Sequence, residues 1–139
     1  MSYTNGGRGE AVVVQSASAA SAADVGKWAP GYQPVTIRAV SVLLRTVPSC
    51  AGVVSFEKRT TIDSDTGRTS FACVAIPNAT AAGTVMYKSG LATTISPGQE
   101  VVVKVTDATG GGTQTIDAVV SYEAGAEVPA NVTTMTASA

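Results

Sequence analysis

The chain has 139 residues, of which 45% are hydrophobic and only 14% are charged, well below the roughly 25% charged content of ordinary soluble domains. Nine basic and ten acidic residues leave a net charge of -1 without a long run of either sign, which excludes an electrostatic footprint for nucleic acid. This length predicts a single domain with a substantial core.

A membrane-spanning helix needs about 18 consecutive apolar residues, and the sequence has no such run. Its N-terminus also lacks the apolar core of a signal peptide. We therefore expect a soluble, cytoplasmic protein that has neither a membrane partner nor a nucleic-acid partner.

The first residues predict an arm followed by a strand. Residues 1–9 are glycine-rich and polar, with Tyr3 as the bulky apolar anchor, which indicates a flexible arm. Three adjacent valines favour a strand over residues 10–15. Residues 16–23 are a run of Ser and Ala with weak helical character.

A connector with turn residues is predicted over residues 24–32, with Trp28 and Tyr32 packing over one end of the core. Residues 35–47 form the longest apolar run, and their β-branched side chains favour a strand. The apolar phase changes within this run, so we expect either a bulge or cover on both faces.

Several shorter strands are predicted next. Residues 52–62 and 68–76 flank the polar loop 63–67, which ends in glycine and is typical of a hairpin. Residues 84–88 and 91–95 predict two short strands separated by a Ser-Gly pair.

The stretch from residue 96 to 122 has the clearest strand pattern. Pro97-Gly98 is a turn signal, and two alternating segments follow on either side of three consecutive glycines. The pattern predicts a β-hairpin whose inward side chains are Val101, Val103, Val105, Ile116, Ala118 and Val120.

About eight short strands separated by turns predict an all-β fold, an antiparallel β-sandwich of jelly-roll type. The expected organisation is a flexible arm over 1–9, a sandwich domain over 10–123 and an extended tail over 124–139, which has no evident strand partner.

Cys50 and Cys73 are the two cysteines of the chain. A hairpin closing near Asp65 places Cys73 opposite Glu57, roughly seven residues or about 23 Å from Cys50 along the strand. We therefore expect two buried thiols that are not joined in a disulfide.

The chain contains no histidine, which removes the commonest general base and the commonest metal ligand. Asp63 and Asp65 have the spacing that begins calcium loops, but the later glutamate of such loops is missing. The loop is therefore interpreted as a turn whose Asp side chains satisfy their own backbone. No catalytic residue, cofactor or metal site is predicted, and we expect a protein that is not an enzyme.

The assembled pattern resembles the decoration, or cement, proteins that bind outside the capsids of tailed bacteriophages. The resemblance rests on the layout and on four phrases. These are Ala82-Gly83-Thr84-Val85-Met86-Tyr87, Ser96-Pro97-Gly98-Gln99-Glu100-Val101, Val119-Val120-Ser121-Tyr122-Glu123 and Val128-Pro129-Ala130-Asn131-Val132-Thr133.

This resemblance implies a structural protein that docks across joints between major capsid protein subunits on the outer surface of the virion. It would also associate with itself, as a dimer or a trimer. The arm and the tail are the expected contact elements because they lack internal partners. The candidate partner-binding residues are Tyr3, Arg8, Trp28, Tyr32, Val128, Pro129, Asn131, Val132 and Met135.

A second hypothesis belongs to a different class. Trp28 and the tyrosines, namely Tyr3, Tyr32, Tyr87 and Tyr122, can form the flat aromatic platform of a carbohydrate-binding or adhesin-like sandwich.

Overall fold

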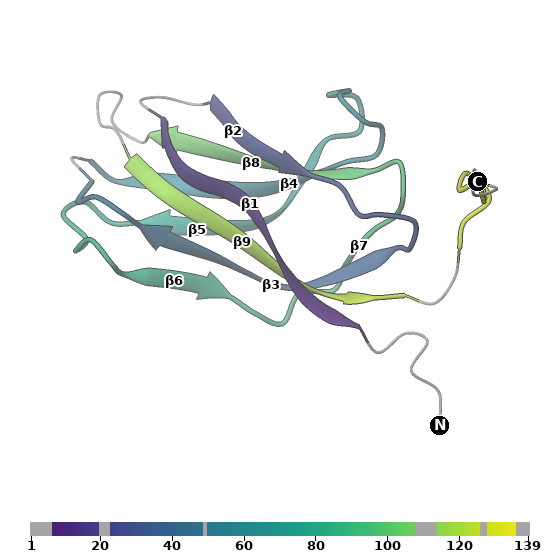
Figure 1. The fold of residues 1–139 in the computed structure, drawn as a ribbon. Coiled ribbons are helices and arrows are strands. Elements are labelled where there is room, and N and C mark those ends of the chain that lie inside the picture. Colours follow the sequence, from purple (N-terminus) through teal and green to yellow (C-terminus); the bar gives the residue numbers. More distant parts are fainter. Residues whose placement is uncertain (1–6, 20–22, 49, 108–113, 126–127, 136–139) are drawn as a thin grey trace.

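The computed structural model describes residues 7–19, 23–48, 50–107, 114–125 and 128–135. In these ranges the chain forms strands that pack as two antiparallel sheets face to face (Figure 1). The strands are β1 (Arg8–Ala19), β2 (Ala23–Trp28), β3 (Val35–Leu44), β4 (Gly52–Arg59), β5 (Thr69–Ile76), β6 (Val85–Lys88), β7 (Thr93–Ile95), β8 (Glu100–Asp107) and β9 (Gln114–Ala124). The described part of the chain has no helix long and apolar enough to cross a membrane.

The strand order confirms the predicted fold class. One sheet has the order β1-β9-β3-β6 with β7 also paired to β3, and the other has the order β2-β8-β4-β5. Strands adjacent in sequence often lie in opposite sheets, which is the double Greek key of a jelly roll. The strands β6 and β7 pair with successive segments of β3, Val40–Leu43 and Val35–Ile37. The pair therefore fills one strand position, which accounts for the expected number of about eight.

The core lies between the two sheets and is built mainly of β-branched side chains. Phe56 is the largest of the fully buried side chains. Each of the six inward positions predicted around the glycine loop is at most 1% exposed, which confirms them as core. Alternation along each strand produces this result, because every second side chain points to the same face.

The predicted hairpin over residues 96–122 is wrong. The strands β8 and β9 do not pair with each other; β8 lies between β2 and β4, and β9 lies between β1 and β3. The two strands belong to opposite sheets and present their apolar faces to the same core from opposite sides. A strand pattern reports which face is buried, but not which strand supplies the hydrogen bonds, so the alternation was equally compatible with both arrangements.

Two further expectations about the first residues are corrected. Strand β1 runs on to Ala19, through part of the Ser and Ala run that was expected to have helical character. The predicted connector contains β2, an edge strand paired with β8. Its sequence Asp24-Val25-Gly26-Lys27 lacks the alternation of a half-buried strand, because β2 interrupts its register between Asp24 and Gly26.

The phase change in the long apolar run is a β-bulge. The pairing of β3 with β9 shifts register between Ile37 and Ala39, which leaves Arg38 as the extra residue. Because of this bulge, Val35 and Ile37 share the buried face with Val40, Val42 and Leu44.

The cysteines are confirmed as thiols without a disulfide between them. Cys50 is buried as expected, whereas Cys73 is exposed. The predicted pairing of Cys73 with Glu57 is also wrong, because Cys73 lies opposite Ser55. The pairs nearest the loop, Lys58 with Thr69 and Glu57 with Ser70, centre it between residues 63 and 64 and not at Asp65, and the extra residue Phe71 on β5 recovers only one position.

Gly26 allows the two edge strands β1 and β2 to approach each other closely. A Cβ atom at this position would lie 2.4 Å from the carbonyl oxygen of Val13 and 2.7 Å from a methyl group of Val14. Backbone cannot move aside as a flexible side chain can, so one flank of the sandwich depends on this missing side chain.

We predict that Gly26→Ala lowers the free energy of unfolding by about 1–3 kcal/mol, the range of other overpacked sites. Urea denaturation followed by tryptophan fluorescence measures the change. Gly31→Ala is the matched control, since a Cβ there meets nothing within 4 Å. Equal stability of the two variants would contradict the close approach of β1 and β2.

Candidate functional site

Most of the predicted partner-binding residues that the structure describes lie at one end of the sandwich. This terminal end comprises the start of β1, the end of β2 with the following loop 29–34, the turn 96–98 and the end of β9. It is the right-hand end in Figure 1, from which both chain termini depart. Tyr3 lies outside the described residues.

Arg8 contributes an ion pair to the terminal end. Its Nη2 lies 3.2 Å from Oε1 of Glu123, and Nη2 of Arg38 lies 3.4 Å from the other carboxylate oxygen. These groups line a surface depression of about 560 Å³ together with Gly9 and Tyr122. The Arg8 side chain is 82% exposed, so the pair contributes little to stability and its guanidinium is accessible to a partner.

An aromatic stack covers the adjoining part of the terminal end. The rings of Trp28 and Tyr122 are 5.4 Å apart between centroids and 27° from parallel, which is an offset-stacked geometry. Both side chains pack against the core, whereas Tyr32 is 62% exposed. The expectation that Trp28 packs over one end of the core is therefore confirmed. The same expectation for Tyr32 is wrong.

These three aromatic residues line a shallow pocket of about 160 Å³, which Pro30 and Gln33 complete. The structure thus brings together three of the aromatic residues that the sequence analysis grouped. It does not bring Tyr87 to them, since that residue lies on β6 in the edge of the sheet.

The C-terminal segment is attached to the terminal end at its root. The backbone N–H of Ala124 donates to the carbonyl of Gly7, and that of Gly125 donates to the carbonyl of Pro34, each over 2.7 Å. Further along, the Asn131 side-chain amide donates to the carbonyl of Pro97 over 2.7 Å. A predicted contact residue, Asn131, therefore has an internal partner and positions the segment.

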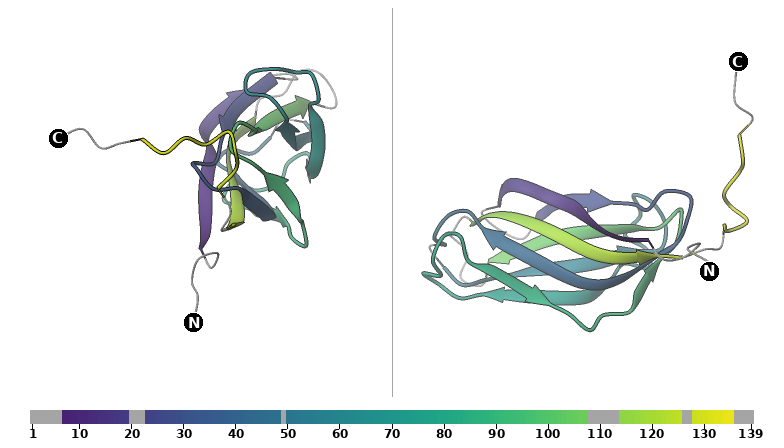
Figure 2. Two further views of the ribbon diagram at one scale, coloured as in Figure 1. Left: turned by 90° about the vertical axis from the view of Figure 1, so that its right-hand side faces the viewer. Right: turned by 60° about the horizontal axis from the view of Figure 1, so that its bottom comes forward.

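The segment 128–135 lies outside the sandwich, and after the attachment at Asn131 it leads away from it (Figure 2). Val128 is 53% exposed and Met135 is 86% exposed, whereas Pro129 and Val132 are half-buried. The Val132 N–H donates to the Pro129 carbonyl over 3.0 Å and closes a turn. The exposed apolar side chains of this segment are available to a partner. Their burial against that partner would stabilise a complex.

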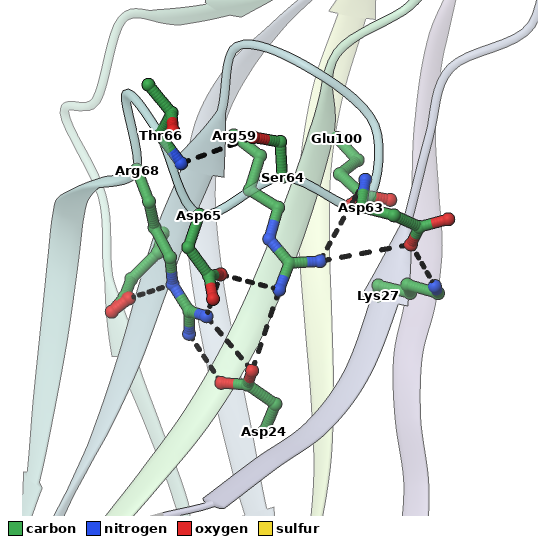
Figure 3. A network of polar contacts seen from close by, with 10 residues as sticks. Asp24, Lys27, Arg59, Asp63, Ser64, Asp65, Thr66, Arg68 and Glu100 are labelled. Atoms are coloured by element: carbon green, nitrogen blue, oxygen red, sulfur yellow. Dashed lines mark hydrogen bonds and ion pairs between the residues drawn. The ribbon is translucent and has the colours of Figure 1, made fainter.

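A second group of polar side chains lies on the outer face of the four-stranded sheet (Figure 3). Its centre is Glu100, which is only 3% exposed. One carboxylate oxygen of Glu100 accepts from Nη1 of Arg59 over 2.9 Å and from the backbone N–H of Asp63 over 3.0 Å. The loop after β4 is thereby held against the sheet, where Val102 is also buried.

Arg59 and Arg68 extend this network to the loop and to β2. Arg59 donates to Asp65 over 2.9 Å. Arg68 donates to Glu57 over 2.8 Å, to Asp65 over 3.1 Å and to both carboxylate oxygens of Asp24. Lys27 pairs with Asp63. The loop aspartates thus form ion pairs with other strands, which corrects the expectation that they serve their own backbone.

The network has the electrostatics of a structural ion cluster. Hydrogen bonding from Arg68 lowers the pKa of Asp24, and hydrogen bonds from Arg68 and Arg59 lower the pKa of Asp65. The same contacts raise the pKa of Arg68, chiefly through Asp24. Each carboxylate that shifts is held in its charged form by a cation, so none is poised as a general acid. Nor do the described residues include three or more acidic or thiol groups placed to hold a metal ion.

This network was not predicted, although one sign of it is present in the sequence. Glu100 and Val102 share a strand face opposite the core residues Val101 and Val103, so an apolar residue at the outward position 102 indicated that something covers this face. The cover itself comes from a loop about forty positions earlier in the chain, as the Arg59 to Glu100 separation of 41 shows.

No protein-family model matches the sequence, and no curated protein does. Among solved structures, a chain from the infectious bursal disease virus Gx strain is similar with a TM-score of 0.44 and 11% identity. The match covers 90% of this chain and 32% of the viral chain, so this protein spans about a third of the length of that chain. A likeness this remote carries no argument about function.

We predict that Arg59→Ala lowers the free energy of unfolding by about 3 kcal/mol, because it leaves the Glu100 carboxylate buried without its cation. Urea denaturation at neutral pH measures the loss. Lys27→Ala is the control, since that side chain and its Asp63 partner are 55% and 62% exposed, and its midpoint should stay at the wild-type value. A wild-type midpoint for Arg59→Ala would show that the network does not support the fold.

Proposed function

We propose that this protein is a non-enzymatic decoration protein that binds the outside of a phage head across major capsid protein subunits and stabilises it. The observation that carries the proposal is the C-terminal segment, which is fixed to the sandwich at its root and then extends away with apolar side chains exposed. The layout and sequence phrases that resemble decoration proteins support the same interpretation.

The segment is chemically suited to pairing with another chain. Residues 128–139 contain no charged side chain, and they include Val132 and several threonines, which favour extended backbone. Such a segment can add to the edge of a partner's sheet through main-chain hydrogen bonds, while side chains such as Met135 enter pockets beside it.

A cement requires no chemistry at the capsid surface. Many copies that each contact two or more neighbours make separation of the shell depend on breaking all of these contacts together. The jelly roll supplies a stiff body, and the accessible Arg8 lies close to the root of the tail. In this proposal the protein acts on the outer surface of the virion and also associates with itself, as a dimer or a trimer.

Deletion of residues 125–139 or of residues 1–9 should reduce co-sedimentation of the protein with expanded phage capsids and the resistance of those capsids to heat. The double variant Val128→Asp and Met135→Asp should reproduce the tail deletion, because it places charges where apolar contacts are expected. Val47→Asp is the control, since Val47 is 57% exposed on the loop that follows β3. Full occupancy and heat resistance in both deletions would refute the proposal.

A second candidate function rests on the pocket at the terminal end, where Tyr32 is exposed beside the stacked rings of Trp28 and Tyr122. Aromatic faces of this kind can stack on sugar rings, and jelly rolls occur among lectin domains.

If the pocket binds a glycan, Tyr32→Ala should abolish the glycan-array signal of the wild type without affecting stability, because the exposed ring contributes little to the core. Tyr87→Ala, at a ring 73% exposed on β6, should retain it. An array on which the wild-type protein gives no signal would rule out this second candidate.

A further inference from the structure

The four edges of the two sheets differ in how well they are protected against pairing with another chain. Natural sandwiches protect edges with charged side chains, bulges or very short strands. Strand β1 carries Arg8 and Glu10 and shifts register twice, and β2 carries charges and shifts register once. The close approach of Gly26 to Val13 also closes this flank of the sandwich.

The opposite flank is protected on one sheet only. Strand β6 has four residues and ends in Lys88, and β7 has three residues. Strand β5 has eight residues, Thr69–Ile76, and contains no charged side chain. It lies at the end of its sheet, with β4 as its partner on the other side.

The second half of β5 is a regular edge. Its register shift occurs at Phe71, and from Ala72 to Ile76 each residue pairs in sequence with β4. The outward side chains of this half, Cys73 and Ala75, are small and exposed. Neither charge nor bulk therefore hinders another strand from pairing with β5.

The neighbouring strand β6 directs its exposed apolar side chains away from this edge. Strands β5 and β6 lie next to each other across the two sheets. Val85 and Tyr87 on β6 are 58% and 73% exposed. Their register partners on β3, Leu43 and Ser41, lie on the outer face of that sheet, so both side chains point away from β5 and leave its edge open.

We propose that two copies of this chain pair through the regular half of β5, antiparallel and about a two-fold axis at Val74. In such a pair Val74 lies opposite its own copy and Cys73 lies opposite Ala75, so a charge at these positions would come close to its own copy, and β5 carries none. The regular and uncharged edge from Ala72 to Ile76 is thus compatible with its own copy, which favours a second copy as its occupant. The two four-stranded sheets would join into one continuous sheet.

This inference specifies the self-association that accompanies the proposed function, but it does not depend on the capsid role. The isolated protein is sufficient to test it. Capsid binding by the tail is measured separately, so either idea can fail while the other stands.

Sedimentation velocity over a range of concentrations should show a dimer for the wild type. Ala75→Lys places two ammonium groups beside the axis and should weaken the dimer by about tenfold or more. The control Ala29→Lys carries the same charge on an exposed residue after β2, at the opposite flank, and should leave the dimer unchanged.

A second measurement uses the wild-type side chains. A short bis-maleimide should join two copies of the wild type through Cys73, and Cys73→Ser should abolish the cross-linked dimer. A wild type that is monomeric or trimeric, a dimer that Ala75→Lys leaves intact, or a wild-type dimer that does not cross-link through Cys73 would overturn the proposal. So would a dimer that is lost on deletion of residues 125–139.

Discussion

The burial of β8 and β9 in one core from opposite sheets is the constraint on which the rest of the sandwich depends. Each strand lies in the interior of its own sheet, with β8 between β2 and β4 and β9 between β1 and β3. Their buried valines, isoleucine and alanine face one another across the core and have almost no exposed surface. The last two strands therefore complete both sheets, and earlier strands such as β2 and β1 gain their main partners only when these strands are in place.

This topology also explains why the candidate binding residues collect at the terminal end. The chain enters through β1 and leaves through β9, which are adjacent and antiparallel, so the two chain ends lie at the same end of the sandwich. The end of β2 lies there too, which brings Trp28 onto Tyr122. A rigid body with its accessible groups at one end and an extended tail beside them is well suited to attachment on a larger surface.

The four-stranded sheet differs between its outer face and its edge at β5. The outer face carries the buried Glu100 with Arg59 and Arg68, which fix a loop and the strand β2 to the sheet. The charges of these three residues are paired within the molecule. The network ends at Arg68, directly before β5, and the strand itself carries no charge where we propose that two copies meet.

The sequence by itself determined the strand content and the buried faces, because alternation with period two reports which side chains leave water. It identified Val101, Ile116 and their neighbours as core, and it indicated the bulge in β3. Tertiary structure alone decided that β8 and β9 occupy opposite sheets, that Gly26 meets Val13 and that Arg59 covers Glu100. These contacts join residues distant in sequence, and a local pattern carries no information about which strand becomes a neighbour.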